Sequence, residues 1–137
     1  MLAMSKSKRK VPLPIEHDEQ VSVAAWLRLH KILFTATANG AMLAGKSAGA
    51  RMGQWRKLQR SGVAQGIPDL LIFDPPPAHP GVIGCAVEMK RQKGGGVSIE
   101  QESWISELRS LGWSVFVARG ADEAIRTLRD LGYGAKR

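Results

Sequence analysis

Glu88 and Lys90 are the residues whose types and spacing most directly suggest chemistry. They lie in "VIGCAVEMK" (82–90), which is typical of a strand. On a strand, residues i and i+2 point to the same face, so the carboxylate and the ammonium group converge on one spot. An exposed edge strand would also carry such a pair. The strand around Glu88 is apolar, but taken alone the pair is explained by an exposed edge, and the case for a site depends on Asp69.

Asp69 is a second acidic residue in a suggestive place. It directly precedes the apolar run 70–73 in "GIPDLLIF" (66–73), which predicts a buried strand. The connection to the next strand, "DPPPAHPG" (74–81), is rich in proline and therefore exposed. The two strands predict a hairpin, in which Asp69 comes close to Glu88. Taken alone, Asp69 could equally be a turn residue after Pro68.

Two carboxylates beside a hydrophobic core are costly and repel each other unless a cation bridges them. Oxygen ligands of this kind select Mg²⁺ or Mn²⁺. Such a metal polarises a phosphoryl oxygen and activates a water molecule. Lys90 would then steady the attacking hydroxide or the charge that develops on the phosphate. The pattern therefore predicts metal-dependent hydrolysis of a phosphate ester.

Gln101 is predicted to face the same site from the first turn of a helix. It shares a helical face with Ile105 and Leu108, at i+4 and i+7. It also stands three residues after Ser98, the spacing of a capping box. The two roles are compatible with each other.

The first helix offers two acidic candidates, Glu16 and Glu19. Glu16 shares a face with Val23 and Leu27, whereas Glu19 aligns with Val23 and Trp26. Acidic residues are also favoured at a helix N-terminus by the macrodipole, without any catalytic role. The spacing leaves both possibilities open.

The elements that must position these residues alternate along the chain. Hydrophobic periodicity and turn signals predict helices over 16–31, 44–60, 98–111 and 122–131, and strands over 32–38, 69–73, 82–90 and 113–118. A hairpin followed by a helical crossover implies a mixed central sheet flanked by helices. The predicted fold class is therefore α/β.

The chain carries a net charge of +8, and its basic residues are segregated. No Asp or Glu occurs between Glu19 and Asp69. That interval and the turn 91–96 are candidates for binding the phosphates of a nucleic acid, although a basic run can also be mere solvated surface. The predicted nucleic-acid-binding residues are Lys46, Arg51, Arg56, Lys57, Arg60, Arg91 and Lys93.

With 137 residues the chain has the length of one domain, predicted here over 15–134. A basic arm (1–14), expected to be disordered, and a basic tail (135–137) flank it. No apolar run approaches the roughly 20 residues of a membrane helix, and no signal-peptide pattern is present, so a cytoplasmic location is expected. One cysteine, Cys85, excludes an internal disulfide framework and a cysteine-based zinc cluster.

Taken together, "GIPDLLIF", "VEMK" and "SIEQESWISELRSLGW" resemble the VRR-NUC branch of the PD-(D/E)XK nuclease superfamily. That pattern comprises a Gly-x-Pro-Asp strand, a Glu-x-Lys strand and a helix that opens with Gln followed by Trp. The upstream "ANGAMLAGKSAGARMGQWRKLQRSGVAQ" is similar to the stand-alone phage and bacterial members, which implies the cytoplasm of a bacterial or phage-infected cell. The resemblance covers residues 16–131.

The resemblance implies a role for each residue of the motifs. Asp69 and Glu88 would bind Mg²⁺ or Mn²⁺, helped by the backbone carbonyl of Met89. Lys90 would be catalytic, and Gln101 would be a supporting residue of the site. The implied fold is restriction-endonuclease-like, with an αβββαβ core.

The acidic residue of the first helix maps best to Glu16, with Glu19 as the alternative. The resemblance further implies an endodeoxyribonuclease, structure-selective for branched DNA such as Holliday junctions, and a homodimer. A non-catalytic DNA-binding module on the same fold is the alternative function, and a basic structural or phage-assembly protein is a third. Retention of Asp69, Glu88 and Lys90 favours the enzyme.

Overall fold

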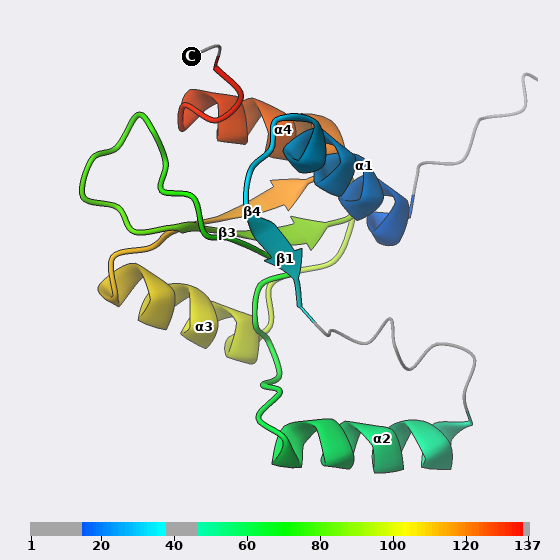
Figure 1. The fold of residues 1–137 in the computed structure, drawn as a ribbon. Helices are drawn as coiled ribbons and strands as arrows, with labels where there is room; N and C mark the ends of the chain where they lie inside the picture. The colour runs from blue at the N-terminus through cyan, green and yellow to red at the C-terminus, as the bar shows by residue number, and fades with distance from the viewer. Residues whose placement is uncertain (1–14, 38–46, 136–137) are drawn as a thin grey trace, which may run out of the picture.

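The computed structural model describes residues 15–37 and 47–135. In these residues, four helices and four strands follow one another in the order predicted from the sequence (Figure 1). They are α1 Glu16–Leu29, β1 Phe34–Ala36, α2 Ala48–Arg60, β2 Leu70–Ile72, β3 Cys85–Lys90, α3 Ile99–Ser110, β4 Ser114–Arg119 and α4 Ala121–Asp130. The strands are shorter than predicted for β1, β2 and β3, because their ends lead into turns and proline-rich loops.

The sheet is mixed, as predicted, with the strand order β1-β2-β3-β4. The pairs β1–β2 and β2–β3 are antiparallel, and the β2–β3 hairpin places Leu70 opposite Val87. The pair β3–β4 is parallel, with Glu88 opposite Val117. Parallel neighbours need a crossover connection, and α3 provides it.

Helices cover the sheet on both faces. One core lies between the sheet and helices α1 and α4, and a smaller core lies under α3 (Figure 1). Within β3, the odd-numbered residues belong to the α1–α4 core, whereas Ala86 belongs to the α3 core. Because alternate strand residues share a face, Glu88 and Lys90 lie on the α3 side of the sheet. The buried Cys85 packs in the opposite core.

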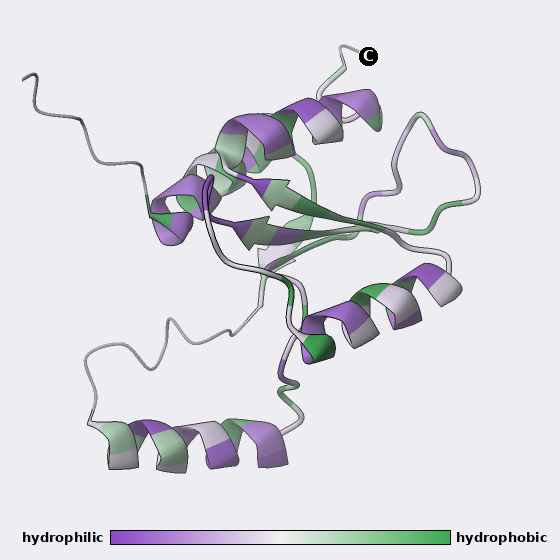
Figure 2. Cartoon of the chain, turned by 180° about the vertical axis from the view of Figure 1, so that it is seen from behind, coloured by the Kyte–Doolittle hydropathy of each residue, from purple (hydrophilic) through white to green (hydrophobic). Residues whose placement is uncertain are grey.

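The two parallel strands change character along their length. Figure 2 shows that β3 and β4 are hydrophobic where they begin and hydrophilic at their C-terminal ends. The N-terminus of α3 lies at this hydrophilic end, since the loop 91–98 leads directly from β3 into the helix. Ser98 caps α3 and completes the predicted capping box with Gln101. This end of the sheet is where the predicted site residues gather.

Helix α2 stands apart from the sheet (Figure 1). None of its thirteen residues, all of which the structure describes, is buried. It begins at Ala48 after the N-cap Ser47, later than predicted, and continues through Gly49 and Gly53. The predicted basic helix therefore exists, but it does not take part in the core.

Some predicted features fall outside the described residues, namely the basic arm 1–14, residue 38 of the first strand, residues 44–46 of the second helix, and residues 136–137 of the tail. Within the described ranges, no helix combines the length and the apolar character that a membrane crossing requires.

Candidate active site

Asp69 lies immediately before β2, where it reaches across to the neighbouring strand. Its carboxylate oxygen Oδ2 accepts a hydrogen bond from the Met89 backbone N–H at 2.7 Å, and the residue is only 8% exposed. Thr37 holds the backbone from the other side, with Oγ1 2.7 Å from the Pro68 carbonyl and its N–H donating to the Asp69 carbonyl at 2.9 Å. Asp69 is therefore fixed between β1 and β3.

Glu88 is the most deeply buried acidic residue of the described chain, with 2% exposure. Its Oε1 accepts a hydrogen bond from Gln101 Nε2 at 2.8 Å and lies 3.6 Å from Lys90 Nζ. Its Oε2 is buried and has no hydrogen-bond partner among the described residues. One oxygen of this carboxylate is therefore satisfied and the other is not.

Gln101 connects the site to the start of α3. Its Oε1 accepts from Lys90 Nζ at 3.0 Å and from the Ser98 N–H at 2.9 Å, while its Nε2 donates to Glu88. This orientation of the Gln101 amide is chemically consistent, since its oxygen faces two donors and its nitrogen faces a carboxylate. Gln101 thus fills the capping box and contacts both Glu88 and Lys90, as the sequence allowed.

The environment of Glu88 disfavours its charged form. Burial, followed by the negative charge of Asp69, raises the pKa of Glu88 from 4.5 to about 8, while the Lys90 ammonium acts in the opposite direction. A carboxylate in this position costs free energy unless positive charge compensates it. Lys90 alone does not supply enough, because the net shift remains upward.

The donor atoms fit a hard divalent cation. Glu88 Oε2 is an orphaned buried oxygen, and the carboxylate of Asp69 is its acidic neighbour. The Met89 N–H points toward Asp69, whereas the Lys90 carbonyl bonds to Gly120 on the opposite side. Since the N–H and carbonyl of one strand residue point to the same side, the Met89 carbonyl is also turned toward Asp69.

The described residues contain no group of three or more His, Cys, Asp or Glu side chains that could hold a metal. A site with two carboxylates is nevertheless sufficient for Mg²⁺, which usually keeps several waters and takes further ligands from substrate phosphates. The chemistry of the available donors, all of them oxygen, therefore fits Mg²⁺ or Mn²⁺ rather than zinc.

Gly66, the first residue of the Gly-x-Pro-Asp motif, places this strand against α3. A Cβ atom added there would lie 2.6 Å from the Glu100 carbonyl carbon and 2.8 Å from the Gln101 nitrogen. Its φ of +86° is also one that favours glycine. The close approach brings the segment leading to Asp69 against the helix that carries Gln101.

Glu16 and Glu19 differ clearly in position. Glu16 is partly exposed at the first residue of α1, and no hydrogen bond within the described chain joins it to Glu88, Lys90 or Gln101. Glu19 is 6% exposed, and its carboxylate accepts hydrogen bonds from Gln92 Nε2 at 2.6 Å and from the Ala121 N–H. The buried face of α1 is thus the Glu19 face, although the catalytic role of either residue stays a prediction.

The predicted DNA-binding residues fall into two groups. Arg91 and Lys93 follow Lys90 in the exposed loop between β3 and α3, so they lie next to the site along the chain. The other described residues belong to α2, which is set apart from the sheet: Arg51, Arg56, Lys57 and Arg60. Lys46 lies outside the described residues.

Three residues around the site had no signal that pointed to them in the sequence. Thr37 supports Asp69 across 31 or more positions, and Gln92 meets Glu19 across 73. Arg119 contacts the loop after Lys90 from 24 or more positions away. Each contact depends on strand register and helix docking, which residue spacing does not encode.

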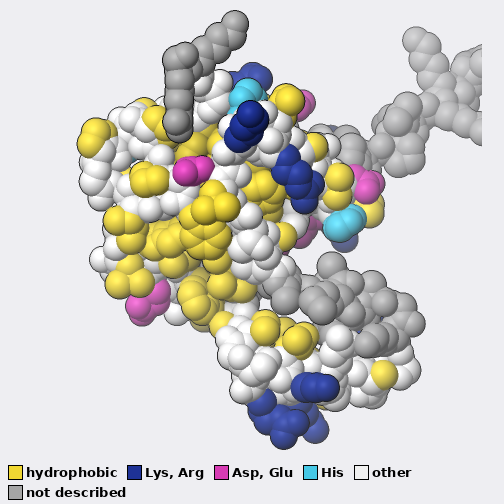
Figure 3. Space-filling model, in the orientation of Figure 1, with side chains coloured by type: hydrophobic (Ala, Val, Ile, Leu, Met, Phe, Trp, Pro, Cys, Tyr) yellow, Lys and Arg dark blue, Asp and Glu magenta, His cyan; other side chains and the backbone are white. Residues whose placement is uncertain are grey.

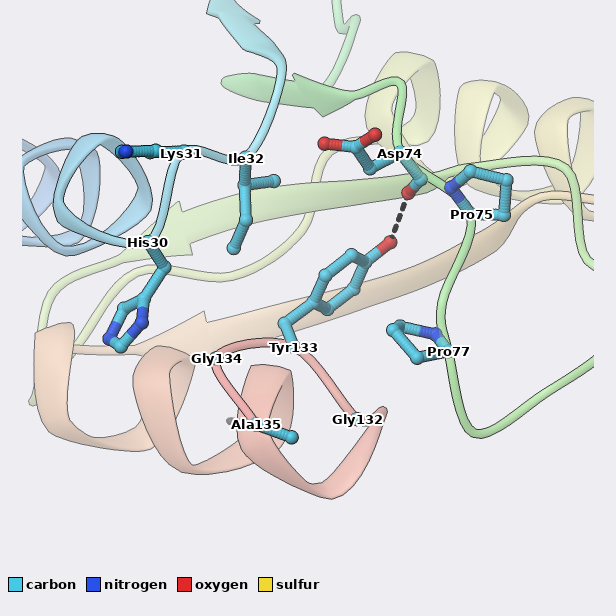
Figure 4. Close-up of a pocket in the computed structure, with 10 residues that line it drawn as sticks. All are labelled: His30, Lys31, Ile32, Asp74, Pro75, Pro77, Gly132, Tyr133, Gly134 and Ala135. Atoms are coloured by element: carbon cyan, nitrogen blue, oxygen red, sulfur yellow. Dashed lines mark hydrogen bonds between the residues drawn. The ribbon is translucent and has the colours of Figure 1, made fainter. Parts of the chain in front are cut away.

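A separate pocket of about 260 Å³ lies beyond the other end of β2 (Figure 4). Its lining includes Tyr133, whose hydroxyl donates to the Asp74 carbonyl at 2.6 Å. The Asp74 carboxylate accepts from the Leu33 N–H at 2.7 Å. The lining therefore offers one carboxylate, already engaged by the backbone, and no second acid to hold a metal with it.

Comparison with known proteins identifies the family and a similar fold. The family model described as "VRR-NUC domain" matches residues 16–122, a range that contains Asp69, Glu88, Lys90 and Gln101. A solved structure described as "VRR_NUC domain protein" superimposes with a TM-score of 0.68 and 21% identity, covering 88% of this chain and 90% of the other. No match was found among curated proteins.

Proposed function

The chain belongs to the VRR-NUC domain family, and on this premise we propose that it is a divalent-metal-dependent endodeoxyribonuclease. The family match implies a nuclease-type fold for processing DNA. The observation that supports catalysis in this chain is the convergence of Asp69, Glu88, Lys90 and Gln101 at one end of the sheet. The types of these residues and their position at one place support metal-dependent hydrolysis.

In this proposal, Asp69, Glu88 and the Met89 carbonyl hold Mg²⁺ or Mn²⁺. The unpartnered Glu88 Oε2 supports this assignment, because a buried carboxylate oxygen without a donor is costly. When bound, the metal supplies a Lewis acid for the phosphate and a hydroxide nucleophile at neutral pH.

Lys90 provides positive charge at the edge of the carboxylates. Its side chain is 11% exposed, and its Nζ lies 3.6 Å from Glu88 Oε1. A fixed cation in a site largely shielded from water stabilises the negative charge that develops on a phosphate during hydrolysis. Gln101 holds this arrangement, since it bonds to both Lys90 and Glu88 and is itself anchored by the Ser98 N–H.

The DNA backbone would contact the basic residues nearest the site. Arg91 and Lys93 directly follow the catalytic strand and are exposed. Figure 3 shows Lys and Arg side chains gathered on the side of α2 that faces away from the sheet. Contacts from such groups to phosphates give salt-dependent binding with little dependence on sequence.

Cleavage of labelled DNA under defined metal conditions tests the proposal. We expect nicking by the wild-type protein with Mg²⁺ or Mn²⁺, none with EDTA, and a fall of about 100-fold or more for Asp69→Asn, because the metal-held nucleophile is lost. Glu107→Gln, an exposed acid on α3, is the matched control and retains activity. Wild-type protein that binds DNA but cleaves no substrate would favour the non-catalytic binding module instead.

We further propose that the enzyme is a homodimer that acts on branched DNA. In the described residues, apolar side chains are exposed at two places, on the sheet and on α2. On the α3 side of β1 and β2, Leu33 is 65% and Phe73 is 46% exposed. On α2, Met52 is 54% exposed, and hydrophobic side chains mostly face the body while basic ones face away (Figure 3). A second copy that exchanges these contacts would cover both surfaces.

Light scattering of purified variants tests the dimer. We expect a dimer for the wild type and a shift to monomer for Met52→Glu or Leu33→Glu, because a buried charge opposes association. Val21→Glu, at an equally exposed position on α1, serves as the control. A monomeric wild type would contradict the dimer. Cleavage rates on junction, flap and plain duplex substrates then test the preference for branches, and equal rates would contradict it.

A further inference from the structure

Arg119, the last residue of β4, forms side-chain hydrogen bonds to the loop between β3 and α3. Its Nη1 donates to the Gly94 carbonyl at 2.7 Å and to the Arg91 carbonyl at 3.2 Å, and its Nη2 donates to the Gly95 carbonyl at 2.8 Å. The planar guanidinium presents its donors in a rigid fork, which allows one side chain to hold several carbonyls at fixed angles. A single residue thus fixes the path of the loop at three points.

The loop 91–96 depends on contacts with other elements to keep one conformation. Residues 91–96 are all exposed, and three of them are consecutive glycines. Gly94 and Gly95 adopt φ values of +78° and +69°, in the left-handed region. A glycine-rich segment loses more conformational entropy on ordering than any other. Among the described residues, the side-chain hydrogen bonds to this loop from other elements come from Arg119 and from Glu19, which accepts from Gln92.

The loop joins the two parts of the candidate site. It begins directly after Lys90 and ends at Ser98, which caps the helix that carries Gln101. Lys90 Nζ and Gln101 Oε1 are 3.0 Å apart, and both side chains contact Glu88. A loop that relaxes would therefore let the end of β3 and the start of α3 move relative to each other.

We propose that Arg119 is a positioning residue of this active site. It holds the loop 91–96 in the one shape that keeps Lys90 and Gln101 aligned on Glu88, and it presents Arg91 and Lys93 at the mouth of the site. The proposal rests on the nuclease function proposed above. Arg119 is exposed, so its side chain fixes the loop rather than filling the core. Its backbone N–H bonds to Glu123 independently of the side chain.

Substitution of Arg119 separates positioning from folding and from binding. We expect Arg119→Ala to lower the single-turnover cleavage rate at saturating DNA by about 10- to 100-fold, because a displacement of about 1 Å in a reacting group has effects of this size. DNA affinity measured with Ca²⁺ should fall by a smaller factor than the cleavage rate, because the Arg119 guanidinium bonds to loop carbonyls and the charges of Arg91 and Lys93 remain. Arg119→Lys should fall in between, because an ammonium cannot bridge three carbonyls.

Arg126→Ala is the matched control, since it removes the same charge from an exposed position on α4. Amide hydrogen exchange provides a second readout that needs no activity. Residues 92–96 should exchange faster in Arg119→Ala than in the wild type or in Arg126→Ala. Unchanged exchange, or an unchanged cleavage rate in an active enzyme, would overturn the role of Arg119 alone. An inactive wild type would instead overturn the nuclease function, and the positioning role with it.

Discussion

At the scale of single residues, the balance of charge around Glu88 dominates the site. This carboxyl is buried beside a second acid, and its second oxygen has no donor among the described residues. A protein tolerates such a group when it serves a function, because strained electrostatics of this kind cluster at catalytic sites. The proposed metal explains the arrangement, since it would compensate both acids at once.

The charge balance predicts how stability depends on pH without metal. The pKa of Glu88 rises from 4.5 to about 8 in the folded state. Its contribution to stability is therefore complete below pH 4.5 and is lost as the pH rises toward 8. In EDTA at pH 8.5, Glu88→Gln should be more stable than the wild type by roughly 2–4 kcal/mol, at about 1.4 kcal/mol per pKa unit and discounted for relaxation.

Urea unfolding of both proteins between pH 4 and pH 9 measures this difference. Glu107→Gln should follow the wild-type curve, because that acid is exposed. Added Mn²⁺ should restore the stability of the wild type at high pH and leave Glu88→Gln unchanged. If the stability of Glu88→Gln had the same pH dependence as that of the wild type, the claim that the buried Glu88 carboxylate is destabilising at high pH would be wrong.

Some of these residues were predictable and others were not, for identifiable reasons. Strand alternation is enough to put Glu88 and Lys90 on one face, and a capping box is visible from spacing alone. The contact from Asp69 to the Met89 N–H depends on the register of β2 against β3, which the sequence does not reveal. The choice between Glu16 and Glu19 was open because the two acids lie three residues apart and both align with Val23 on the apolar face of α1.

At the scale of elements, the site depends on how closely the segment before β2 approaches α3. Gly66 makes that approach possible, and Gly62 provides a comparison within the same connection. Both residues have positive φ, +86° and +105°, but a Cβ at Gly62 would meet nothing within 4 Å. The pair therefore separates the cost of the backbone conformation from the cost of the contact with α3.

Gly66→Ala should be more destabilising than Gly62→Ala. Each substitution carries a left-handed penalty of about 1–2 kcal/mol. Gly66→Ala also forces the Glu100–Gln101 backbone to shift, for which overpacking costs of about 1–3 kcal/mol are typical. Cleavage should fall with it, since Gln101 moves, while Gly62→Ala retains near-normal activity.

Denaturant unfolding and single-turnover cleavage check both expectations. Equal losses for the two substitutions would mean that the contact with α3 is not needed to place Asp69 and Gln101.

The order and type of all eight elements followed from hydrophobic periodicity and turn signals. The separation of α2 from the sheet could not be predicted in this way, because an amphipathic pattern does not reveal what covers the apolar side of a helix.

At the scale of the whole molecule, the candidate site and a large part of the basic charge lie on separate parts of the structure. The core that carries the carboxylates is compactly covered by α1, α3 and α4, whereas α2 projects from it with basic residues turned away (Figures 1 and 3). The net charge of +8 predicted a polyanionic partner. It could not show that part of the charge sits on a separate helix.

This division predicts that α2 contributes binding and not chemistry. Replacing Arg56 and Arg60 together with Gln should weaken DNA binding and reduce the slope of log affinity against log salt by up to about 2, since each phosphate contact contributes about 0.9 for duplex DNA. The single-turnover rate at saturating DNA should stay within about twofold, as expected for groups that bind the phosphate backbone without contacting the reacting one.

Fluorescence anisotropy at several salt concentrations measures this slope. Arg126→Gln, on α4, should leave it unchanged. An unaltered slope in the double variant would place the DNA elsewhere on the molecule.

The most direct test of the central claim, that this site hydrolyses DNA with a bound metal, is the behaviour of Lys90→Ala. Mn²⁺ binding by calorimetry, DNA affinity and single-turnover cleavage are measured on the same preparation beside the wild type. We expect Lys90→Ala to keep metal and DNA binding within about threefold, because Asp69 and Glu88 remain, while cleavage falls by about 100-fold or more. Cleavage at the wild-type rate in Lys90→Ala would contradict the account.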